Sequence, residues 1–177
     1  MNNLNNNKSQ NNSISMSKYS VYLVPFDYNG PVQSNFVDWG GVKPHATLFS
    51  FKHLDYTKLH DLTKSLASAE GGNQWLFNTN DRNSEYYVNS TFTMLLFSSR
   101  RIENIMSEYK KHFDVKIRSE QLHITFGYTN HLTQEDISEI YSNIINSKDW
   151  RLVIVESKQK GENDYEAIWR DNFKLQY

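Results

Sequence analysis

Hydrophobic and polar residues alternate along several short runs of the chain, and a period of two is typical of half-buried β-strands. β-Branched and aromatic side chains dominate these runs, as expected for strands. The pattern predicts strands at Ser20–Pro25, His45–Phe51, Gln74–Thr79, His123–Tyr128, Trp150–Ser157 and Tyr165–Phe173. One further apolar stretch, Tyr86–Phe97, predicts either a pair of strands or one long strand.

Helices are predicted where a capping residue precedes a segment with helical spacing of apolar residues. Such segments run from Asp55 to about Ala69, from Ser98 or Ser99 to about His112, and from Thr133 to about Asn146. Thr133 and Asp136 are spaced as in a capping box. The order of strands and helices predicts an α+β fold of two related lobes.

Two segments lack this patterning. Residues 1–17 are rich in Asn, Ser and Gln and offer almost nothing apolar to bury, which predicts a disordered tail. Residues 27–42 contain Gly30, Pro31 and the pair Gly40-Gly41, which predicts a loop. We expect residues 18–177 to form a single two-lobed domain, because this length suits one folded unit.

Composition limits the possible partners. The net charge is -1, so the chain lacks the positive field that attracts long nucleic acids, and we expect none as a partner. The absence of cysteine excludes disulfides, thiolate zinc sites and cysteine nucleophiles. No apolar run approaches the roughly 18–20 residues that span a bilayer, and the start lacks a signal-peptide layout. We therefore expect a monomer in the cytoplasm or nucleus, without membrane association.

Candidate chemistry lies in two matching segments, PHATL at 44–48 and LHITF at 122–126. In each, a histidine is followed two residues later by a threonine: His45 by Thr47, and His123 by Thr125. Residues i and i+2 of a strand point to the same face, so each pair should share one face. The intervening apolar residues should face a core: Ala46, Leu48, Ile124 and Phe126.

The two pairs supply the groups that opening a cyclic phosphodiester requires. A base must take a proton from water, and an acid must protonate the departing oxygen on the other side of phosphorus. Histidine titrates near 6.5, so neutral and protonated imidazoles coexist near neutral pH. Threonine hydroxyls can donate hydrogen bonds to the non-bridging oxygens. This chemistry needs no metal and no cofactor.

Other interpretations of the pairs remain open at this point. Both residue types are tolerated on half-exposed strands, so the spacing can arise by chance. Two histidines can also bind zinc, although no carboxylate or cysteine stands at ligand spacing beside them. A serine hydrolase is less well supported, because the chain lacks a G-x-S-x-G segment.

On these paired motifs, which are 78 residues apart, the chain resembles the two-histidine (2H) phosphoesterase superfamily. It looks closest to the eukaryotic cyclic phosphodiesterases of the plant and yeast type. Softer support comes from YSVYLVP at 19–25, YYVNSTFTMLLF at 86–97, LTQED at 132–136 and YEAIWRDN at 165–172. The resemblance implies antiparallel sheets that line a central cleft, with helices on the outside.

The resemblance also implies roles and substrates. His45 and His123 are expected to be catalytic, and Thr47, Thr125 and Tyr128 to bind substrate. The implied substrates are ADP-ribose 1'',2''-cyclic phosphate, a by-product of tRNA splicing, and nucleoside 2',3'-cyclic phosphates. The products would be ADP-ribose 1''-phosphate and nucleoside 2'-phosphates. The family usually has a full helix where this chain has the predicted loop at 27–42.

Two alternative functions are also compatible with the paired motifs. The chain can be a phosphodiesterase that acts on 2',5'- or 3',5'-linked oligonucleotides or on cyclic oligonucleotide signals. It can also be a binding module that holds nucleotides without turnover.

Several further residues are candidates for the edge of the cleft. Strict alternation places Phe49 on the face of His45 and Thr47, where it lines the cleft floor or packs in the core. Tyr128 lies five residues after His123 and joins that face only if the strand bends near Gly127. Trp39 can flank the cleft or anchor a loop. Two cations, Lys43 and Arg118, can hold a second phosphate or be simply solvated.

Overall fold

The computed structural model describes residues 18–31, 43–52, 54–69, 85–115, 121–162 and 165–176. Several predictions fall outside these ranges. They concern the tail at 1–17, most of the loop at 27–42, the strand at Gln74–Thr79, Trp39 and Arg118.

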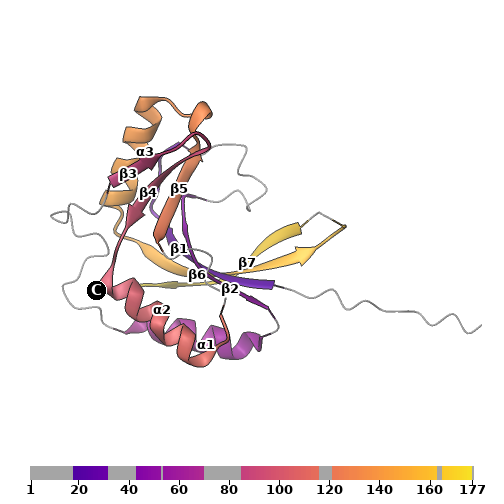
Figure 1. The fold of residues 1–177 in the computed structure, drawn as a ribbon. Coiled ribbons are helices and arrows are strands. Elements are labelled where there is room, and N and C mark those ends of the chain that lie inside the picture. Colours follow the sequence, from indigo (N-terminus) through magenta and orange to yellow (C-terminus); the bar gives the residue numbers. More distant parts are fainter. Residues whose placement is uncertain are drawn as a thin grey trace, which may run out of the picture.

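The strands form two antiparallel sheets (Figure 1). The four-stranded sheet has the order β2-β1-β6-β7 and consists of β1 (Lys18–Pro25), β2 (Ala46–Lys52), β6 (Trp150–Gln159) and β7 (Tyr165–Lys174). The three-stranded sheet has the order β3-β4-β5 and consists of β3 (Glu85–Val88), β4 (Phe92–Phe97) and β5 (Leu122–Tyr128). The predicted stretch at Tyr86–Phe97 is therefore a pair of strands, and the α+β fold class is confirmed.

The three predicted helices are confirmed, and each begins at a side-chain cap. They are α1 (Tyr56–Ser68), capped by Asp55, α2 (Arg100–His112), capped by Ser99, and α3 (Gln134–Asn146), capped by Thr133. Thr133 and Asp136 form a reciprocal capping box, which satisfies two backbone N–H groups at the start of α3. A single 3₁₀ turn, η2 (Thr129–His131), separates β5 from α3.

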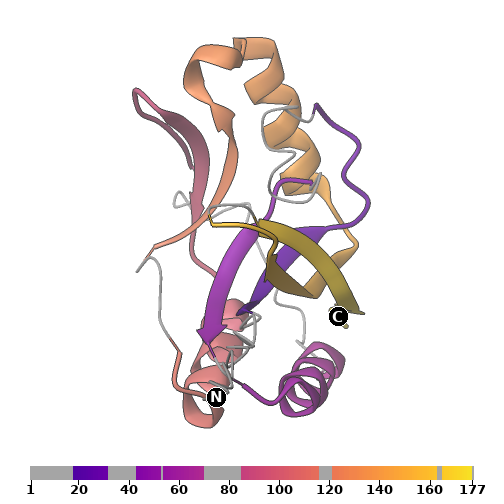
Figure 2. The same ribbon diagram turned by 90° about the vertical axis from the view of Figure 1, so that its right-hand side faces the viewer.

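The main core lies between the sheets and the helices. Helices α1 and α2 lie together on one side of the four-stranded sheet, and α3 lies beside the three-stranded sheet (Figure 2). Core side chains come from both sheets and all three helices, among them Leu23, Phe49, Leu59, Leu95, Ile102, Tyr109, Ile124, Ile140 and Ile154. Their burial removes apolar surface from water, which is the dominant favourable term in folding.

The four-stranded sheet is apolar on its second face as well. A smaller cluster there contains Tyr22, Val24, Val153 and Val155 from the central strands β1 and β6. Phe26, Ala167 and Trp169 pack against this cluster. The cluster matters for the candidate site, because Thr47 lies directly opposite Tyr22 in the sheet.

Among the described residues, no helix is both long enough and apolar enough to cross a membrane.

Candidate active site

The two histidine–threonine pairs lie on neighbouring edge strands. His45 stands immediately before β2, which is an edge strand of the four-stranded sheet, and His123 is in β5, an edge strand of the three-stranded sheet. Strands β2 and β5 are in direct contact. The fold therefore brings together two motifs that are far apart in the sequence and belong to different sheets.

Each histidine ring makes the same local hydrogen bond. Nδ1 of His45 lies 3.2 Å from the carbonyl oxygen of Lys43, and Nδ1 of His123 lies 3.2 Å from the carbonyl oxygen of Gln121. A carbonyl oxygen only accepts hydrogen bonds, so Nδ1 must be the donor in both rings. In a neutral ring this tautomer leaves the lone pair on Nε2.

Both motif strands contain a β-bulge at the same distance from their histidine. The pairing of β1 with β2 shifts so that Leu48 has no partner, and the pairing of β4 with β5 shifts so that Phe126 has none. Each of these residues follows its histidine by three positions. A bulge adds one residue to a strand, so side chains beyond it change face.

The bulges explain where two candidate residues point. Phe49 follows the first bulge and is fully buried in the main core beside Leu48. Two positions were predicted for the Phe49 side chain. Packing in the core is confirmed, and the alternative prediction that it lines the floor of a cleft is wrong. The predicted core positions of Ala46, Ile124 and Phe126 are also confirmed, because all are at most 4% exposed.

Tyr128 follows the second bulge, and its ring is half-buried among aromatic neighbours. It stacks on Phe92 with a centroid separation of 5.1 Å and meets the His131 ring edge-on at 5.8 Å. Because Gly127 and Phe126 are both on the buried side, Tyr128 returns to the face of His123 and Thr125. The register shift at Phe126 lies next to Gly127, where a bend was the condition for Tyr128 to join this face.

The surroundings of His45 favour the neutral imidazole. Burial lowers the pKa of His45 to about 4. The hydrogen bond to the Lys43 carbonyl opposes this effect, and the charge of His123 adds to it. At neutral pH, His45 therefore carries an unprotonated Nε2.

Both threonines are half-buried and stand opposite a residue of the neighbouring strand. Thr47 is paired with Tyr22 of β1, and Thr125 with Met94 of β4. Within the described part of the chain, neither threonine hydroxyl is held in a hydrogen bond, whereas buried Thr63 donates to the Leu59 carbonyl. The two hydroxyls can thus donate to a bound oxyanion.

Tyr22 is a site residue that sequence reasoning missed. Its ring lies on the His45 ring, with centroids 4.3 Å apart and planes inclined by 20°. The only sequence signal was an aromatic residue in an otherwise aliphatic strand segment. That signal does not reveal the stacking, because it depends on the register between β1 and β2.

Lys43 contacts Phe26, and the remaining histidines lie in helices, in the turn after β5 or outside the described residues. The Lys43 ammonium donates to the Phe26 carbonyl and lies 5.7 Å from the centre of the Phe26 ring. His60 and His112 belong to helices α1 and α2. His131 is in η2, where it contacts Tyr128. His53 lies outside the described residues.

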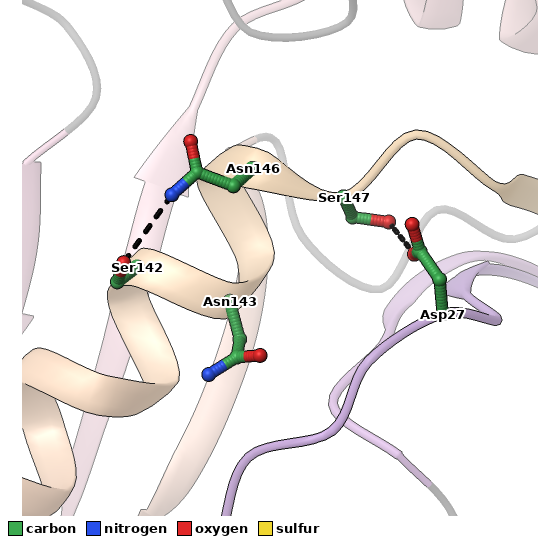
Figure 3. Close-up of a pocket in the computed structure, with 5 residues that line it drawn as sticks. All are labelled: Asp27, Ser142, Asn143, Asn146 and Ser147. Atoms are coloured by element: carbon green, nitrogen blue, oxygen red, sulfur yellow. Dashed lines mark hydrogen bonds between the residues drawn. The ribbon is translucent and has the colours of Figure 1, made fainter.

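A small polar pocket lies elsewhere, at the carboxyl end of α3 (Figure 3). It has a volume of about 170 Å³ and is lined by Asp27, Ser142, Asn143, Asn146 and Ser147. The Asp27 carboxylate accepts hydrogen bonds from the Ser147 hydroxyl and from the backbone N–H of Lys148. These contacts tie the segment after β1 to the start of β6.

Within the described ranges, no three His, Cys, Asp or Glu side chains are grouped so that they could hold a metal ion. No protein-family model, curated protein or solved structure matches the chain.

Proposed function

We propose that this protein is a two-histidine phosphoesterase that opens small cyclic phosphates by hydrolysis, without a metal. The proposed substrates are ADP-ribose 1'',2''-cyclic phosphate and nucleoside 2',3'-cyclic phosphates. In this proposal the two sheets are the cores of two related lobes, and each lobe contributes one histidine–threonine pair to a shared cleft.

The observation that carries the proposal is the equivalence of the two motifs. In both, Nδ1 of the histidine meets the carbonyl oxygen two residues earlier at 3.2 Å, and in both a bulge follows the histidine by three residues. Chance spacing of His and Thr does not require the same ring orientation or the same strand irregularity. A shared geometry is expected if both rings must present Nε2 to one phosphate.

His45 is assigned as the general base. Its neutral ring has the free lone pair on Nε2, because Nδ1 carries the proton that is donated to Lys43. A base must be unprotonated before the reaction, and the low pKa of His45, about 4, meets this condition at neutral pH. His123 is then the general acid, which enters the reaction protonated on Nε2.

The reaction balances with these two groups. Water attacks phosphorus while its proton passes to Nε2 of His45. The bond between phosphorus and the 3' oxygen breaks, and that oxygen takes the proton from Nε2 of His123. The product is the nucleoside 2'-phosphate. The hydroxyls of Thr47 and Thr125 donate to the non-bridging oxygens, where negative charge accumulates.

Substrate profiling of purified protein in EDTA tests the proposal. We expect turnover of at least one of the two proposed substrate types. His45→Ala and His123→Ala should each lower kcat by about 10²–10⁴-fold, the usual contribution of general acid–base catalysis. His112→Ala is the matched control, because this exposed histidine is at the end of α2, and it should retain full activity.

Different failures have different meanings. Near wild-type turnover by either histidine variant would contradict the two-histidine mechanism. Loss of activity in EDTA with recovery in zinc would favour the metal alternative. Cleavage of 2',5'- or 3',5'-linked dinucleotides instead of cyclic phosphates would support the two-histidine mechanism but contradict the proposed substrates. Tight binding of cyclic nucleotides without product on prolonged incubation would favour a binding module.

A further inference from the structure

Tyr22 and His45 form a stacked pair of rings. Their centroids are 4.3 Å apart and their planes are inclined by only 20°. The His45 ring is also held at Nδ1 by the Lys43 carbonyl. One hydrogen bond fixes the position of one ring atom but leaves the plane of the ring adjustable. The stacked tyrosine supplies the second restraint, because it covers one face of the imidazole.

Tyr22 is itself held firmly. It is 9% exposed and packs with Val24, Val153 and Val155 on the second face of the four-stranded sheet. It lies in β1, which is paired on one side with β2 and on the other side with β6. A ring fixed by two neighbouring strands and a valine cluster can act as a rigid support.

The second motif has no such support at the equivalent position. Tyr22 lies opposite Thr47, which immediately precedes the bulge residue Leu48. Met94 likewise lies opposite Thr125, which immediately precedes the bulge residue Phe126. The two motifs therefore have the same register against the neighbouring strand, but the residue opposite the threonine differs between them. An aromatic ring stands beside the motif of His45, and a flexible thioether beside the motif of His123.

We propose that Tyr22 is a positioning residue, which holds the His45 ring in one plane and shields it from water so that it stays the neutral base. The difference between Tyr22 and Met94 then separates the roles of two otherwise equivalent histidines. This inference rests on the proposed function for its catalytic meaning, but the state of the His45 ring can be measured without any substrate.

Three segments of the described chain contribute groups that act on the His45 ring. Tyr22 in β1 covers its face, His123 in β5 repels its positive form, and Lys43 accepts the Nδ1 proton at its backbone carbonyl. Of these, burial has the largest effect on the pKa of His45 and lowers it. Removing the tyrosine ring should therefore raise this pKa toward the ordinary value of roughly 6.5.

The experiment is a pH titration of the imidazole nitrogens by NMR in the full chain and in four variants. Tyr22→Phe keeps the stacked ring and should leave the tautomer and the pKa of His45 unchanged. Tyr22→Leu and Tyr22→Met remove it and should raise the pKa by at least about one unit and mix the two tautomers. Val155→Ala is the matched control, since it loosens the same cluster without removing the ring on His45.

The same variants give a kinetic readout that a purely structural role would not change. A base whose pKa rises toward 6 is mostly protonated at pH 5, so Tyr22→Leu should lose about tenfold in kcat/KM relative to wild type at pH 5 and should match wild type at pH 8. Tyr22→Phe and Val155→Ala should follow the wild-type profile.

A failure of the positioning role can be distinguished from a failure of the proposed function. If no cyclic phosphate is turned over but the Tyr22 variants change the His45 ring as described, the positioning role stands and the reaction must be revised. If Tyr22→Leu and Tyr22→Met both leave the pKa and tautomer of His45 as in wild type, the positioning role is overturned. Tyr22→Met provides the second test if leucine does not fold, because methionine occupies the equivalent register position in β4.

Discussion

At the scale of single residues, the proposed chemistry depends on how two identical side chains become different. His45 and His123 have the same hydrogen bond to a carbonyl two residues earlier. Only His45 lies against an aromatic ring of β1, and burial lowers its pKa to about 4. The contrast arises from neighbours on adjacent strands, because the motifs themselves are alike.

The low pKa of His45 also predicts how stability depends on pH. In the unfolded chain this group titrates near 6.5, and in the folded protein near 4. The unfolded state therefore binds the proton at higher pH. The stabilisation linked to the low pKa of His45 is present above about pH 6.5, is lost as pH falls to about 4, and amounts to about 3 kcal/mol.

Urea unfolding at pH 7.5 and at pH 4.5 measures this contribution. The free energy of unfolding should fall less between these two values in His45→Gln than in wild type, because glutamine has no proton to take up. An equal fall in both proteins would show that His45 titrates normally in the folded state.

The threonine hydroxyls are predicted to act on charge in the transition state. Thr47→Val and Thr125→Val keep the shape of the side chain and remove the donor, so each should lower kcat by about 10–10²-fold, with a smaller change in KM. Thr47→Ser and Thr125→Ser retain the hydroxyl and should recover most of the rate. If the valine variants kept the wild-type kcat, the hydroxyls would not contact the reacting phosphate.

At the scale of elements, local signals were sufficient to predict the helices. Asp55, Ser99 and Thr133 each cap the helix that was expected to begin there. Such signals lie within a few residues of the helix start, so sequence alone reveals them. The burial of Ala46 and Ile124 on the core face was also predictable, because side chains alternate between the two faces of each strand up to the bulge.

What lies beyond the bulges could not be predicted. No glycine or turn residue marks the bulge at Leu48, and alternation placed Phe49 on the wrong face. The bulge at Phe126 precedes Gly127, so a bend there was foreseeable, and Tyr128 follows it. The stacking of Tyr22 required the register of β1 against β2, which no pattern within one strand contains.

Helix α3 offers an element-level test that separates stability from activity. Its buried residues Ile137, Ile140 and Ile144 belong to the main core, as do Ile124 and Phe126 of β5. Thr133→Ala removes the capping hydrogen bond and should lower the free energy of unfolding by about 1 kcal/mol.

Chemical denaturation measures that loss, and Thr133→Ser, which keeps a capping hydroxyl, should restore most of it. The value of kcat should stay unchanged in both variants. A large drop in kcat for Thr133→Ala would mean that α3 positions the reacting groups, which the proposed arrangement does not include.

At the scale of the whole molecule, two antiparallel sheets meet through their edge strands β2 and β5. Strand β5 contains one histidine–threonine pair and β2 begins directly after the histidine of the other, so in the proposed mechanism neither sheet alone supplies both the base and the acid. The net charge of -1 provides no long-range attraction for a polyanion, which fits a substrate the size of one or two nucleotides.

Whether His45 and His123 open the ring is measured most directly by following a nucleoside 2',3'-cyclic phosphate by ³¹P NMR in EDTA, with the wild-type protein and with the double variant His45→Gln/His123→Gln. We predict that wild type converts the cyclic phosphate into the nucleoside 2'-phosphate as the single product, and that the folded double variant forms no product above the uncatalysed rate. Product formation at the wild-type rate by the double variant would contradict the claim that these two histidines open the ring.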